Sequence, residues 1–462
     1  MIKNELNVDN GLNENSNWSS NDSKSISKKY AKELSAPLSV QIEVTSSCNV
    51  SCIHCYNTWQ TWEKIYDHLD IEKADRIVSQ LVENWVFSMW ITWWEPLIKK
   101  EVTSHLIEQW NKHWLTTRLN SNLMLLTPEI AKEFKSSKLR SILTSLTSFD
   151  EETHDKITWR KWNFKKVIEG IQIALDENIK TGVNMVVTKL NRDHVYKTWE
   201  FLHWLWVKSF FATKWSWPVN IPNFEKYAAW KDDIINSLHD LIKVKDDFWM
   251  NVDILECYPL CLLWEDSDFS LFSSHKCTAW ITSLTIWANW EVRACNHADK
   301  SYWNIFKEDL SSIWKRMQEW RTGELLPEKC ISCEYLFKCT WWCRMDAYWC
   351  WDIKMMDPFA KPENIPKIAE MLKVNEKNTA ELYWKIMRID SWIVFREENG
   401  CCIINKWVSN AIITKDSWIL LQNLLKNEYF TIDAVAKEFD IDIKILNSFF
   451  NTLLNKNFIK II

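Results

Sequence analysis

A strand-then-helix rhythm repeats about six times between Ser39 and Trp215, and it constrains the fold of this 462-residue chain more than any other feature. Apolar or β-branched runs predict strands at Ser39–Thr45, Val86–Thr92, Thr116–Leu123, Ser141–Thr147, Gly182–Thr188 and Lys208–Thr213. Helical spacing lies between them at Ile71–Asn84, Ile98–Lys112, Pro128–Phe134, Phe164–Leu175 and Asp193–His203. Alternating strands and helices predict an α/β fold with a parallel sheet. Six units favour a partial (β/α)6 TIM-like barrel with its reactive site at the C-terminal strand ends, and a doubly wound sheet is the alternative.

The rest of the chain divides by composition and periodicity. Residues 1–36 are polar and lack the apolar core of a signal peptide, so we expect a disordered tail there. The barrel is expected over 37–240, a small Cys-rich domain over 241–360, a linker over 361–382 and a further module over 383–462. In that module, Glu381–Asn405 predicts short strands, and Ser417–Leu425, Ile432–Phe439 and Ile443–Leu454 predict three helices. This order suggests a winged-helix-like module.

Charge and hydropathy exclude several classes of protein. The 56 Lys and Arg residues against 61 Asp and Glu residues give a net charge of −5, which argues against a strongly basic nucleic-acid binder. No run of 18 apolar residues exists, so no transmembrane helix and no membrane partner are expected. We therefore expect a cytoplasmic protein.

The 14 cysteines favour metal ligation, because no secretion signal accompanies them and their distribution is uneven. Three lie close together, and a gap of about 200 residues separates them from a crowded second set. The first set is Cys48, Cys52 and Cys55. The second set is Cys257, Cys261, Cys277, Cys295, Cys330, Cys333, Cys339, Cys343 and Cys350.

The first three cysteines directly follow the first predicted strand, with the spacing Cys48-x3-Cys52-x2-Cys55. Three thiolates on one loop can hold three irons of a [4Fe–4S] cluster and leave the fourth iron open for a ligand. The alternative is a zinc loop, but zinc prefers four ligands, and His54 is the other donor between these cysteines. The spacing therefore favours an iron–sulfur cluster with an open iron site.

The segment from Cys48 to Tyr56 resembles the signature of radical S-adenosylmethionine (SAM) enzymes. The resemblance implies that SAM binds the open iron and that its reductive cleavage yields a 5′-deoxyadenosyl radical, which abstracts a substrate hydrogen. It also implies an electron donor such as ferredoxin or flavodoxin, and it places His54 beside the adenine. Ser145 and Asn122 are the candidates for contacting SAM, although each can equally be a polar residue at a strand end. No residue is assigned a catalytic role.

A second match to the family depends on two tryptophans. After the second strand the family has Gly-Gly-Glu-Pro, whose backbone approaches the methionine part of SAM, and this chain has Trp93-Trp94-Glu95-Pro96. The resemblance places Trp93, Trp94 and Glu95 at the cofactor. Two indoles there would fill the space that SAM needs, whereas Gly permits close backbone approach.

The same replacement explains the composition. The chain has 33 Trp and only 5 Gly, where roughly 32 Gly would be normal. Trp85 and Trp206 stand at predicted helix ends and Trp290 at a predicted hairpin turn, where Gly is favoured. We hypothesise that many of these Trp are glycines from a reassigned UGA codon, while Trp314 fits relatives as a genuine Trp. The alternative is that all Trp are real and the enzyme is inactive or unusual.

The second set of cysteines resembles the SPASM extension of the family, which carries auxiliary clusters. The matching pattern is Cys277-x12-Trp290-x4-Cys295, then Cys330-x2-Cys333-x5-Cys339-x3-Cys343, then Cys350. The resemblance implies two auxiliary [4Fe–4S] clusters. Cluster I would use Cys261, Cys277, Cys295 and Cys343, and cluster II would use Cys330, Cys333, Cys339 and Cys350. Cys257 is as near as Cys261, and either can be the ligand.

The C-terminal segment from Ser409 to Ile459 resembles the PqqD-like peptide-recognition module. Such modules bind a leader peptide as an extra strand at their sheet edge. Basic and acidic side chains are nearly equal in number from Tyr383 onward, which disfavours nucleic acid as a partner. The alternative is an appendage with another interaction role.

Together these features predict a SPASM-type radical SAM oxidoreductase that modifies a ribosomally made peptide or a protein side chain. One alternative is a sulfatase-maturase-like enzyme that makes formylglycine. Those relatives carry Asp after the second auxiliary Cys, whereas Asn296 follows Cys295 here. A second alternative is a non-catalytic iron–sulfur scaffold that binds peptides.

Overall fold

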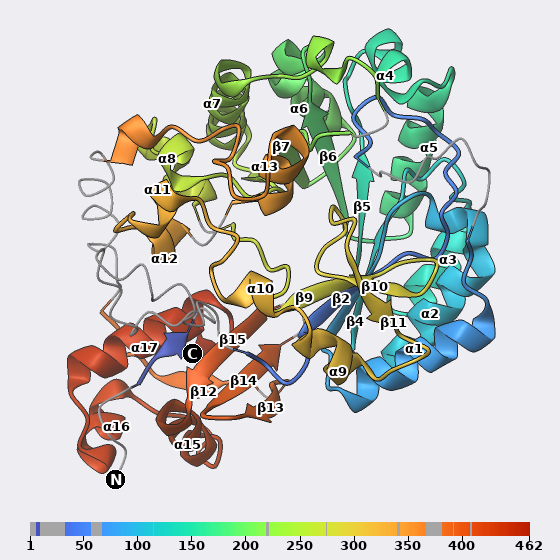
Figure 1. The fold of residues 1–462 in the computed structure, drawn as a ribbon. Helices are drawn as coiled ribbons and strands as arrows, with labels where there is room; N and C mark the ends of the chain where they lie inside the picture. The colour runs from blue at the N-terminus through green and yellow to red at the C-terminus, as the bar shows by residue number, and fades with distance from the viewer. Residues whose placement is uncertain are drawn as a thin grey trace.

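The computed structural model describes residues 6–9, 33–56, 67–113, 115–218, 221–273, 275–339, 342–365, 381–390, 392–406 and 409–462. Most of the predicted tail, 1–36, and most of the predicted linker, 361–382, lie outside these residues. Figure 1 shows an α/β body in blue and green, a Cys-rich region in yellow and orange, and a C-terminal module in red.

A ten-stranded sheet with the order β11-β10-β9-β2-β3-β4-β5-β6-β7-β8 forms the centre of the molecule. Its parallel strands are β2 (Ser39–Ile42), β3 (Ser88–Ile91), β4 (Thr116–Asn120), β5 (Ser141–Ser145), β6 (Thr181–Val187), β7 (Ser209–Lys214) and β8 (Asn251–Asp253). β9 (Ser283–Ile286) lies parallel to β2 on the other side, and β10 (Glu291–Arg293) and β11 (Ser301–Asn304) extend that edge as antiparallel strands. The strand order does not reverse between β2 and β8, so the sheet is the predicted partial barrel and not a doubly wound sheet.

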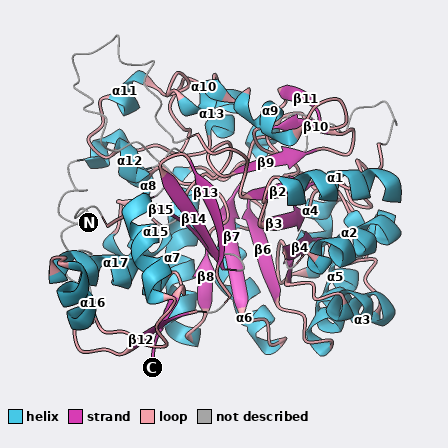
Figure 2. Cartoon of the chain, turned by 90° about the horizontal axis from the view of Figure 1, so that it is seen from below, coloured by secondary structure: helices cyan, strands magenta, loops and turns pink. Residues whose placement is uncertain are grey.

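Helices cover the outside of this sheet, and Figure 2 shows them around the central strands. They are α1 (Ile71–Glu83), α2 (Lys100–Lys112), α3 (Pro128–Ser136), α4 (Glu151–Thr158), α5 (Asn163–Asp176), α6 (Val195–Trp204) and α7 (Lys231–Phe248). Side-chain caps fix several starts: Asp70, Thr127 and Asp150 each accept a hydrogen bond from the backbone N–H three residues later. No helix in the described ranges is long and apolar enough to cross a membrane.

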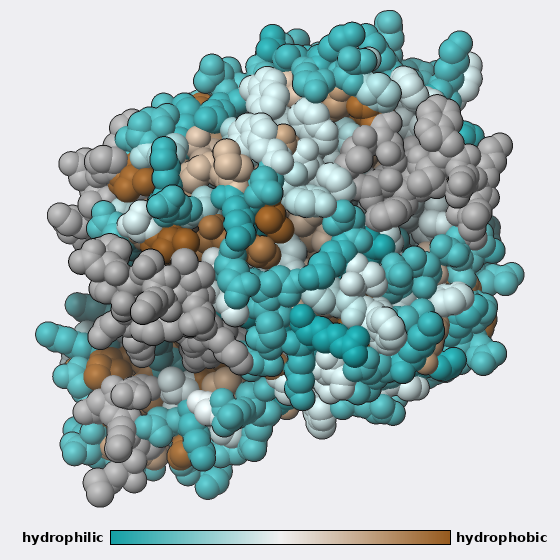
Figure 3. Space-filling model, in the orientation of Figure 1, coloured by the Kyte–Doolittle hydropathy of each residue, from teal (hydrophilic) through white to brown (hydrophobic). Residues whose placement is uncertain are grey.

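The Cys-rich region contains only short helices, as expected for a segment with little periodicity. They are α8 (Leu260–Leu263), η5 (Ser267–Phe272), α9 (Leu310–Lys315), α10 (Gln318–Arg321), α11 (Glu328–Ile331), α12 (Leu336–Cys339), α13 (Arg344–Cys350) and η6 (Pro362–Asn364). On the face drawn in Figure 3, hydrophobic residues gather over this region, while hydrophilic residues cover most of the barrel helices.

The C-terminal module has its own core and matches the predicted winged-helix-like arrangement. Its strands β13 (Val394–Glu398), β14 (Cys401–Lys406) and β15 (Ser409–Thr414) form an antiparallel sheet. The predicted helices correspond to α15 (Lys415–Leu424), α16 (Ile432–Phe439) and α17 (Ile443–Asn455), and β12 (Met387–Ile389) pairs with β16 (Ile459–Ile461). One strand was not predicted: β1 (Val8–Asp9), from the segment expected to be a disordered tail, pairs with β15.

Many tryptophans have the backbone conformation of glycine. Nine of them in the described ranges have φ between 51° and 70°, namely Trp85, Trp93, Trp94, Trp159, Trp162, Trp206, Trp249, Trp280 and Trp290. Left-handed φ costs a residue with a Cβ roughly 1–2 kcal/mol, and Gly adopts it freely. In contrast, Trp314 lies in α9, is fully buried and donates its indole N–H to the Leu34 carbonyl at 2.8 Å. The left-handed positions therefore have the backbone expected for Gly, and Trp314 has the environment of an ordinary Trp.

The end of α6 offers a matched test of this distinction. Trp204 is the last helical residue and 75% exposed, whereas Trp206 is 80% exposed with φ of 65°. We expect Trp206→Gly to raise the free energy of unfolding by about 1 kcal/mol, because it removes left-handed strain. Trp204→Gly should lower it by about 0.5–1 kcal/mol, because Gly is a poor helix former. Urea unfolding followed by circular dichroism measures both, and equal effects of the same sign would contradict this account.

Candidate active-site cavity

One cavity of about 500 Å³ lies at the C-terminal ends of the barrel strands, where the sequence predicts the reactive site. Residues at or just beyond these ends line it, among them Thr92 after β3, Asn120 on β4, Ser145 on β5 and Lys214 on β7. The Cys-rich region forms the other side of the cavity. Both parts of the chain therefore contribute to one site.

The loop after β2 carries Cys48, Cys52 and Cys55 to this cavity. The N–H groups of Ser51 and Ile53 donate to carbonyls at the end of α4, and this fixes the loop. Burial raises the pKa of Cys48 to about 12, and burial, together with the nearby Cys55 and Cys48, raises the pKa of Cys52. Thiols with raised pKa values become thiolates only when a cation balances their charge. Three thiols on one loop therefore fit an iron–sulfur cluster.

Several buried polar atoms in the cavity lack a hydrogen-bond partner. They include Nδ1 of His54, Oδ1 of Asn120, Oδ1 of Asn163, Oγ of Ser216 and Oγ1 of Thr285. Burial lowers the pKa of His54 to about 4, so its ring is neutral at pH 7. An unpaired buried polar group costs about 1–3 kcal/mol. These atoms therefore fit a polar ligand, and a cofactor with adenine, ribose and amino-acid groups such as SAM would satisfy them.

Of the other predicted cofactor residues, Ser145 and Asn122 line the cavity, whereas Glu95 is buried. Ser145 is exposed and lines the cavity at the end of β5. Asn122 also lines the cavity, and its side-chain amide donates to Oδ1 of Asn49. Glu95 is fully buried behind the loop, where its carboxylate accepts hydrogen bonds from Leu97 N–H, Ser121 Oγ–H and Asn122 N–H. Glu95 thus holds the turn between β3 and η2 (Pro96–Lys99) to the loop after β4.

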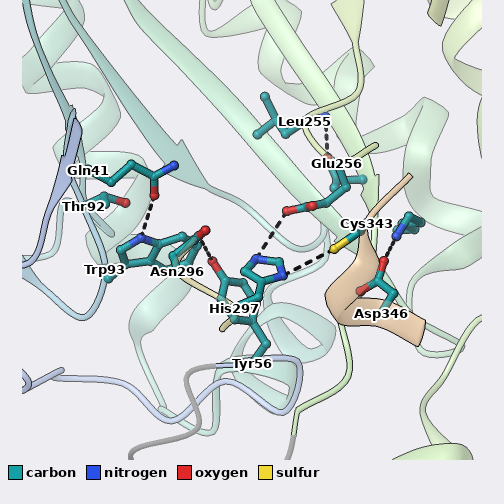
Figure 4. Close-up of polar contacts among 12 residues, drawn as sticks. Gln41, Tyr56, Thr92, Trp93, Leu255, Glu256, Asn296, His297, Cys343 and Asp346 are labelled. Atoms are coloured by element: carbon teal, nitrogen blue, oxygen red, sulfur yellow. Dashed lines mark hydrogen bonds and ion pairs between the residues drawn. The ribbon is translucent and has the colours of Figure 1, made fainter. Parts of the chain in front are cut away.

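Trp93 and Trp94 line the cavity, and Figure 4 shows Trp93 beside Gln41, Asn296 and Tyr56. The Trp93 indole donates to Oε1 of Gln41 at 3.0 Å and packs edge-on against Tyr56, with 4.6 Å between ring centroids. The Trp94 side chain is hydrogen-bonded to Glu43, whose pKa burial raises to about 8. Both tryptophans have left-handed φ. Glycines at these two positions would remove the strain of left-handed φ and enlarge the cavity.

A second group of thiols faces the same cavity. Cys257, Cys277, Cys295 and Cys343 all line it. Cys257 is hydrogen-bonded to Cys277, and the pKa values of Cys295 and Cys343 are raised mainly by burial, with a further contribution from Cys277. The structure thus places Cys257, and not Cys261, with the other three cysteines that the resemblance assigns to auxiliary cluster I.

Cys261 lies with a third group of thiols. Its sulfur accepts a hydrogen bond from Lys361 N–H at 3.3 Å. Its charge raises the pKa of Cys330 and of Cys339, and Cys333 acts on all three. Cys350 ends α13, and the charges that act most on its pKa are those of Asp346, Asp357 and Lys214.

Polar residues that the sequence analysis missed join the two sides of the cavity (Figure 4). His297 lies 4.0 Å from the Cys343 sulfur and 3.7 Å from a carboxylate oxygen of Glu256. Its ring also packs on Tyr56, with centroids 3.8 Å apart, and burial lowers its pKa to about 4. The ligand atoms of Glu256, His297 and Cys343 lie within 4.8 Å of one another, so they could also hold a metal ion. In the sequence, these two residues could have been found from their positions: Glu256 directly precedes Cys257, and His297 lies two residues after Cys295.

Lys214 and Asp346 form a fully buried ion pair beside these residues. The Asp346 charge counteracts the effect of burial on Lys214, so its pKa stays above the usual range. The pair joins the end of β7 to α13 and so fixes the Cys-rich region to the barrel.

We expect Asp346→Ala to lower the free energy of unfolding by about 3–5 kcal/mol, because it leaves a buried ammonium without its partner. The double variant Lys214→Met and Asp346→Leu should recover most of this loss, since it removes both charges. Urea unfolding of the two variants measures the difference. A double variant no more stable than the single one would contradict the role of the pair.

Sequence comparison identifies the barrel. Residues 42–202 match the model of the Radical SAM superfamily. The chain is 31% identical over 159 residues to a GTP 3′,8-cyclase of Nitrobacter hamburgensis, covering 33% of this chain and 45% of that protein. It is 24% identical over 158 residues to an AdoMet-dependent heme synthase of Methanosarcina barkeri, covering 34% and 45%. The chain thus spans about half the length of the curated relatives it matches.

Structural comparison extends over more of the chain. SuiB of Streptococcus suis bound to S-adenosylmethionine superposes with a TM-score of 0.56 at 19% identity, covering 71% of this chain and 76% of SuiB. The enzyme anSMEcpe with bound AdoMet gives 0.57 at 17% identity, covering 74% and 100%. At this identity the likeness shows the fold, which is the radical SAM partial barrel followed by a Cys-rich region. Residues 42–202, which carry the three-cysteine loop, are therefore similar in sequence to the Radical SAM superfamily, and the strand-end cavity lies in the fold that its structures share.

Proposed function

We propose that this chain is a SPASM-type radical SAM enzyme that modifies a peptide or a protein side chain by hydrogen abstraction. The observation that carries the proposal is that the three-cysteine loop and the thiols Cys257, Cys277, Cys295 and Cys343 line the same cavity. A substrate in that cavity would contact both sets. The cavity lies between the barrel and the Cys-rich region, where a peptide side chain can enter.

The described residues fit the cofactors. Cys48, Cys52 and Cys55 would hold a [4Fe–4S] cluster, and the unpaired polar atoms of His54 and Asn120 would bind SAM. When bound, the cluster and SAM supply a 5′-deoxyadenosyl radical after one electron arrives from a donor such as ferredoxin or flavodoxin. Glu95 holds the turn after β3 to the loop after β4 through its three hydrogen bonds. Tyr56, which packs on His297 at the cavity, would help to exclude water from the reacting atoms.

The geometry supports a revised set of auxiliary ligands. Cluster I would use Cys257, Cys277, Cys295 and Cys343. Cluster II would use Cys261, Cys330, Cys333 and Cys339, with Cys350 outside it. Compared with the assignment by resemblance, Cys257 replaces Cys261 in cluster I, and Cys261 replaces Cys350 in cluster II.

Iron content tests these ligand sets. Three [4Fe–4S] clusters correspond to about 12 irons per chain. We expect Cys257→Ala to lower the iron content of the anaerobically reconstituted protein by about one cluster, because cluster I would lose one of its four proposed ligands. Cys350→Ala is the matched control and should retain the full content. The reverse result for these two variants would restore Cys350 as a ligand and exclude Cys257.

A peptide is the substrate class that the structural neighbours support. SuiB is described bound to the precursor peptide SuiA, and anSMEcpe bound to AdoMet and a peptide. The sulfatase-maturase-like alternative is less well supported, because Asn296 takes the place of an acidic residue and donates its amide N–H to Tyr56 at 2.9 Å. An amide in that role does not accept a proton from substrate.

The same proposal includes glycine at many of the Trp positions. The left-handed φ of Trp93 and Trp94 supports it at the cofactor site, and the seven other left-handed Trp support it elsewhere. The codons of the gene test it directly: UGA at these positions and UGG at Trp314 is the expected result. UGG throughout would exclude a reassigned codon.

The activity test uses the same two positions. We expect reconstituted Trp93→Gly/Trp94→Gly protein to bind SAM and form 5′-deoxyadenosine, with a rate at least about tenfold above that of the chain with both tryptophans, because loss of the two indoles from the lining would enlarge the cavity. Trp206→Gly is the control for a Gly at a surface left-handed position and should not change the rate. Cys52→Ser should abolish the reaction.

High-performance liquid chromatography measures the nucleoside, and mass spectrometry measures the peptide encoded beside the gene. Deoxyadenosine with a mass change in the peptide supports peptide modification. A double-glycine variant that binds iron but never cleaves SAM would instead support the non-catalytic scaffold.

A further inference from the structure

His297 is a buried side chain that contacts both groups of residues around the two sets of thiols in the cavity. It comes two residues after Cys295 and is 5% exposed. Its ring packs on Tyr56, which directly follows Cys55 in the chain. The same ring faces Cys343 on its other side, as Figure 4 shows. His297 therefore connects the loop of the first set of cysteines to the second set.

Two hydrogen-bond donors of His297 are directed at sulfur atoms of the proposed cluster I. The backbone N–H groups of His297 and Ala298 are hydrogen-bonded to the Cys295 sulfur. In the side chain, Nδ1 of His297 lies 4.0 Å from the Cys343 sulfur. Hydrogen bonds to sulfur are longer than those to oxygen, because the sulfur atom is larger. The backbone and the side chain of one residue thus face two of the proposed ligands.

The second ring nitrogen is compatible with a hydrogen on Nδ1. A metal-bound thiolate carries no hydrogen, so the Cys343 sulfur would accept a hydrogen bond and could not donate one. Nε2 of His297 lies 3.7 Å from a carboxylate oxygen of Glu256. A protonated Glu256 carboxyl can donate to Nε2 of a neutral ring, and an ionised one can accept from Nε2 of an imidazolium ring. In both arrangements Nδ1–H is directed at the sulfur.

Tyr56 restricts the direction of the imidazole. The centroids of the two rings lie 3.8 Å apart, with an angle of 45° between the ring planes. The Tyr56 hydroxyl accepts a hydrogen bond from the side-chain amide of Asn296 at 2.9 Å. Because Tyr56 is also bonded to Cys55, the loop of the first three cysteines helps to keep His297 directed at Cys343.

A donor at this position affects the electron affinity of an iron–sulfur cluster. The reduced cluster carries one more negative charge than the oxidised cluster, and part of that charge lies on the sulfur atoms. An N–H group directed at a ligating sulfur therefore stabilises the reduced cluster more than the oxidised one. Hydrogen bonds to the sulfurs are among the factors that set the reduction potential.

We propose that His297 is a positioning residue that donates a hydrogen bond from Nδ1 to the Cys343 sulfur and thereby raises the reduction potential of cluster I. The inference rests on the proposed function, because it requires a cluster at the second set of thiols. The higher potential makes cluster I a better electron acceptor than it would be without this donor.

The test uses the full chain after anaerobic reconstitution. His297→Phe keeps a ring against Tyr56 and removes both ring nitrogens, and His297→Asn restores an N–H donor near the position of Nδ1. Tyr56→Phe is the matched control, because it keeps the ring on His297 and removes only the hydroxyl that accepts from Asn296. Redox titration followed by electron paramagnetic resonance measures the potential of each cluster. The component that is missing in Cys257→Ala identifies cluster I.

We expect the ratio of reduced to oxidised cluster I at a fixed potential to fall about tenfold in His297→Phe. This change corresponds to a midpoint potential lower by about 59 mV for a one-electron couple. His297→Asn should recover most of the shift, and Tyr56→Phe should leave the potential of cluster I unchanged. The iron content of all three variants should equal that of wild type.

An unchanged potential of cluster I in His297→Phe, at full iron content, would overturn the inference. Equal shifts in His297→Phe and His297→Asn would also overturn it, because the change in packing and not the donor would then be responsible. Loss of cluster I iron from both variants would make His297 a ligand and exclude its role as a donor. If His297→Phe alone loses the cluster, His297→Leu takes its place, since leucine also lacks a donor.

The same measurements separate this inference from the proposed function. Wild-type protein without a cluster at the second set of thiols would contradict the proposed ligand set itself. A cluster I that is present in wild type and keeps its potential in His297→Phe contradicts only the role of His297. Deoxyadenosine formation by the wild-type chain reports the proposed activity independently of either result.

Discussion

The parallel register of β2 to β7 is the constraint on which the rest of the site depends. Because these strands run in the same direction and pair in sequence order, their C-terminal ends meet on one side of the molecule. The cysteine loop after β2 and the polar residues that end β4, β5 and β7 therefore reach one cavity, although they are far apart in the chain. The hydrogen bonds of Glu95 show the same effect, since they join the turn after β3 to the loop after β4.

The Cys-rich region adds what the barrel lacks. It has short helices and groups of buried thiols whose pKa values are raised by burial and by one another. Thiols that lie this close together avoid charge repulsion only when they are protonated or bound to cations. Metal binding to the thiolates therefore contributes to the free energy of folding. The buried pair of Lys214 and Asp346 fixes this region to the barrel, so the second group of thiols lines the same cavity as the first.

Local patterns predicted much of this structure. The six strands, the cysteine loop and the three C-terminal helices follow from periodicity and spacing, and the left-handed backbone at Trp85, Trp206 and Trp290 follows from turn and cap chemistry. The choice between Cys257 and Cys261 could not be predicted, because spacing alone does not show that Cys261 lies within the short helix α8. The spacing also does not show that Cys257 lines the same cavity as Cys277, Cys295 and Cys343.

Long-range contacts account for the remaining differences. Lys214, Glu256 and His297 come from β7, the segment after β8 and the segment after β10, and only the folded chain brings them to one cavity. β1 has two residues and no periodic signal, and it exists because β15 offers an edge. Sequence polarity indicated a tail, and tertiary pairing made residues 6–9 a strand.

The central claim is that two sets of thiolates hold iron on opposite sides of one cavity. Anomalous X-ray scattering at the iron edge from crystals of the anaerobically reconstituted protein tests it most directly. The account predicts one iron cluster at Cys48, Cys52 and Cys55 and a second at Cys257, Cys277, Cys295 and Cys343, with the cavity between them. Anomalous density at only one of these two positions, or at neither, would contradict it.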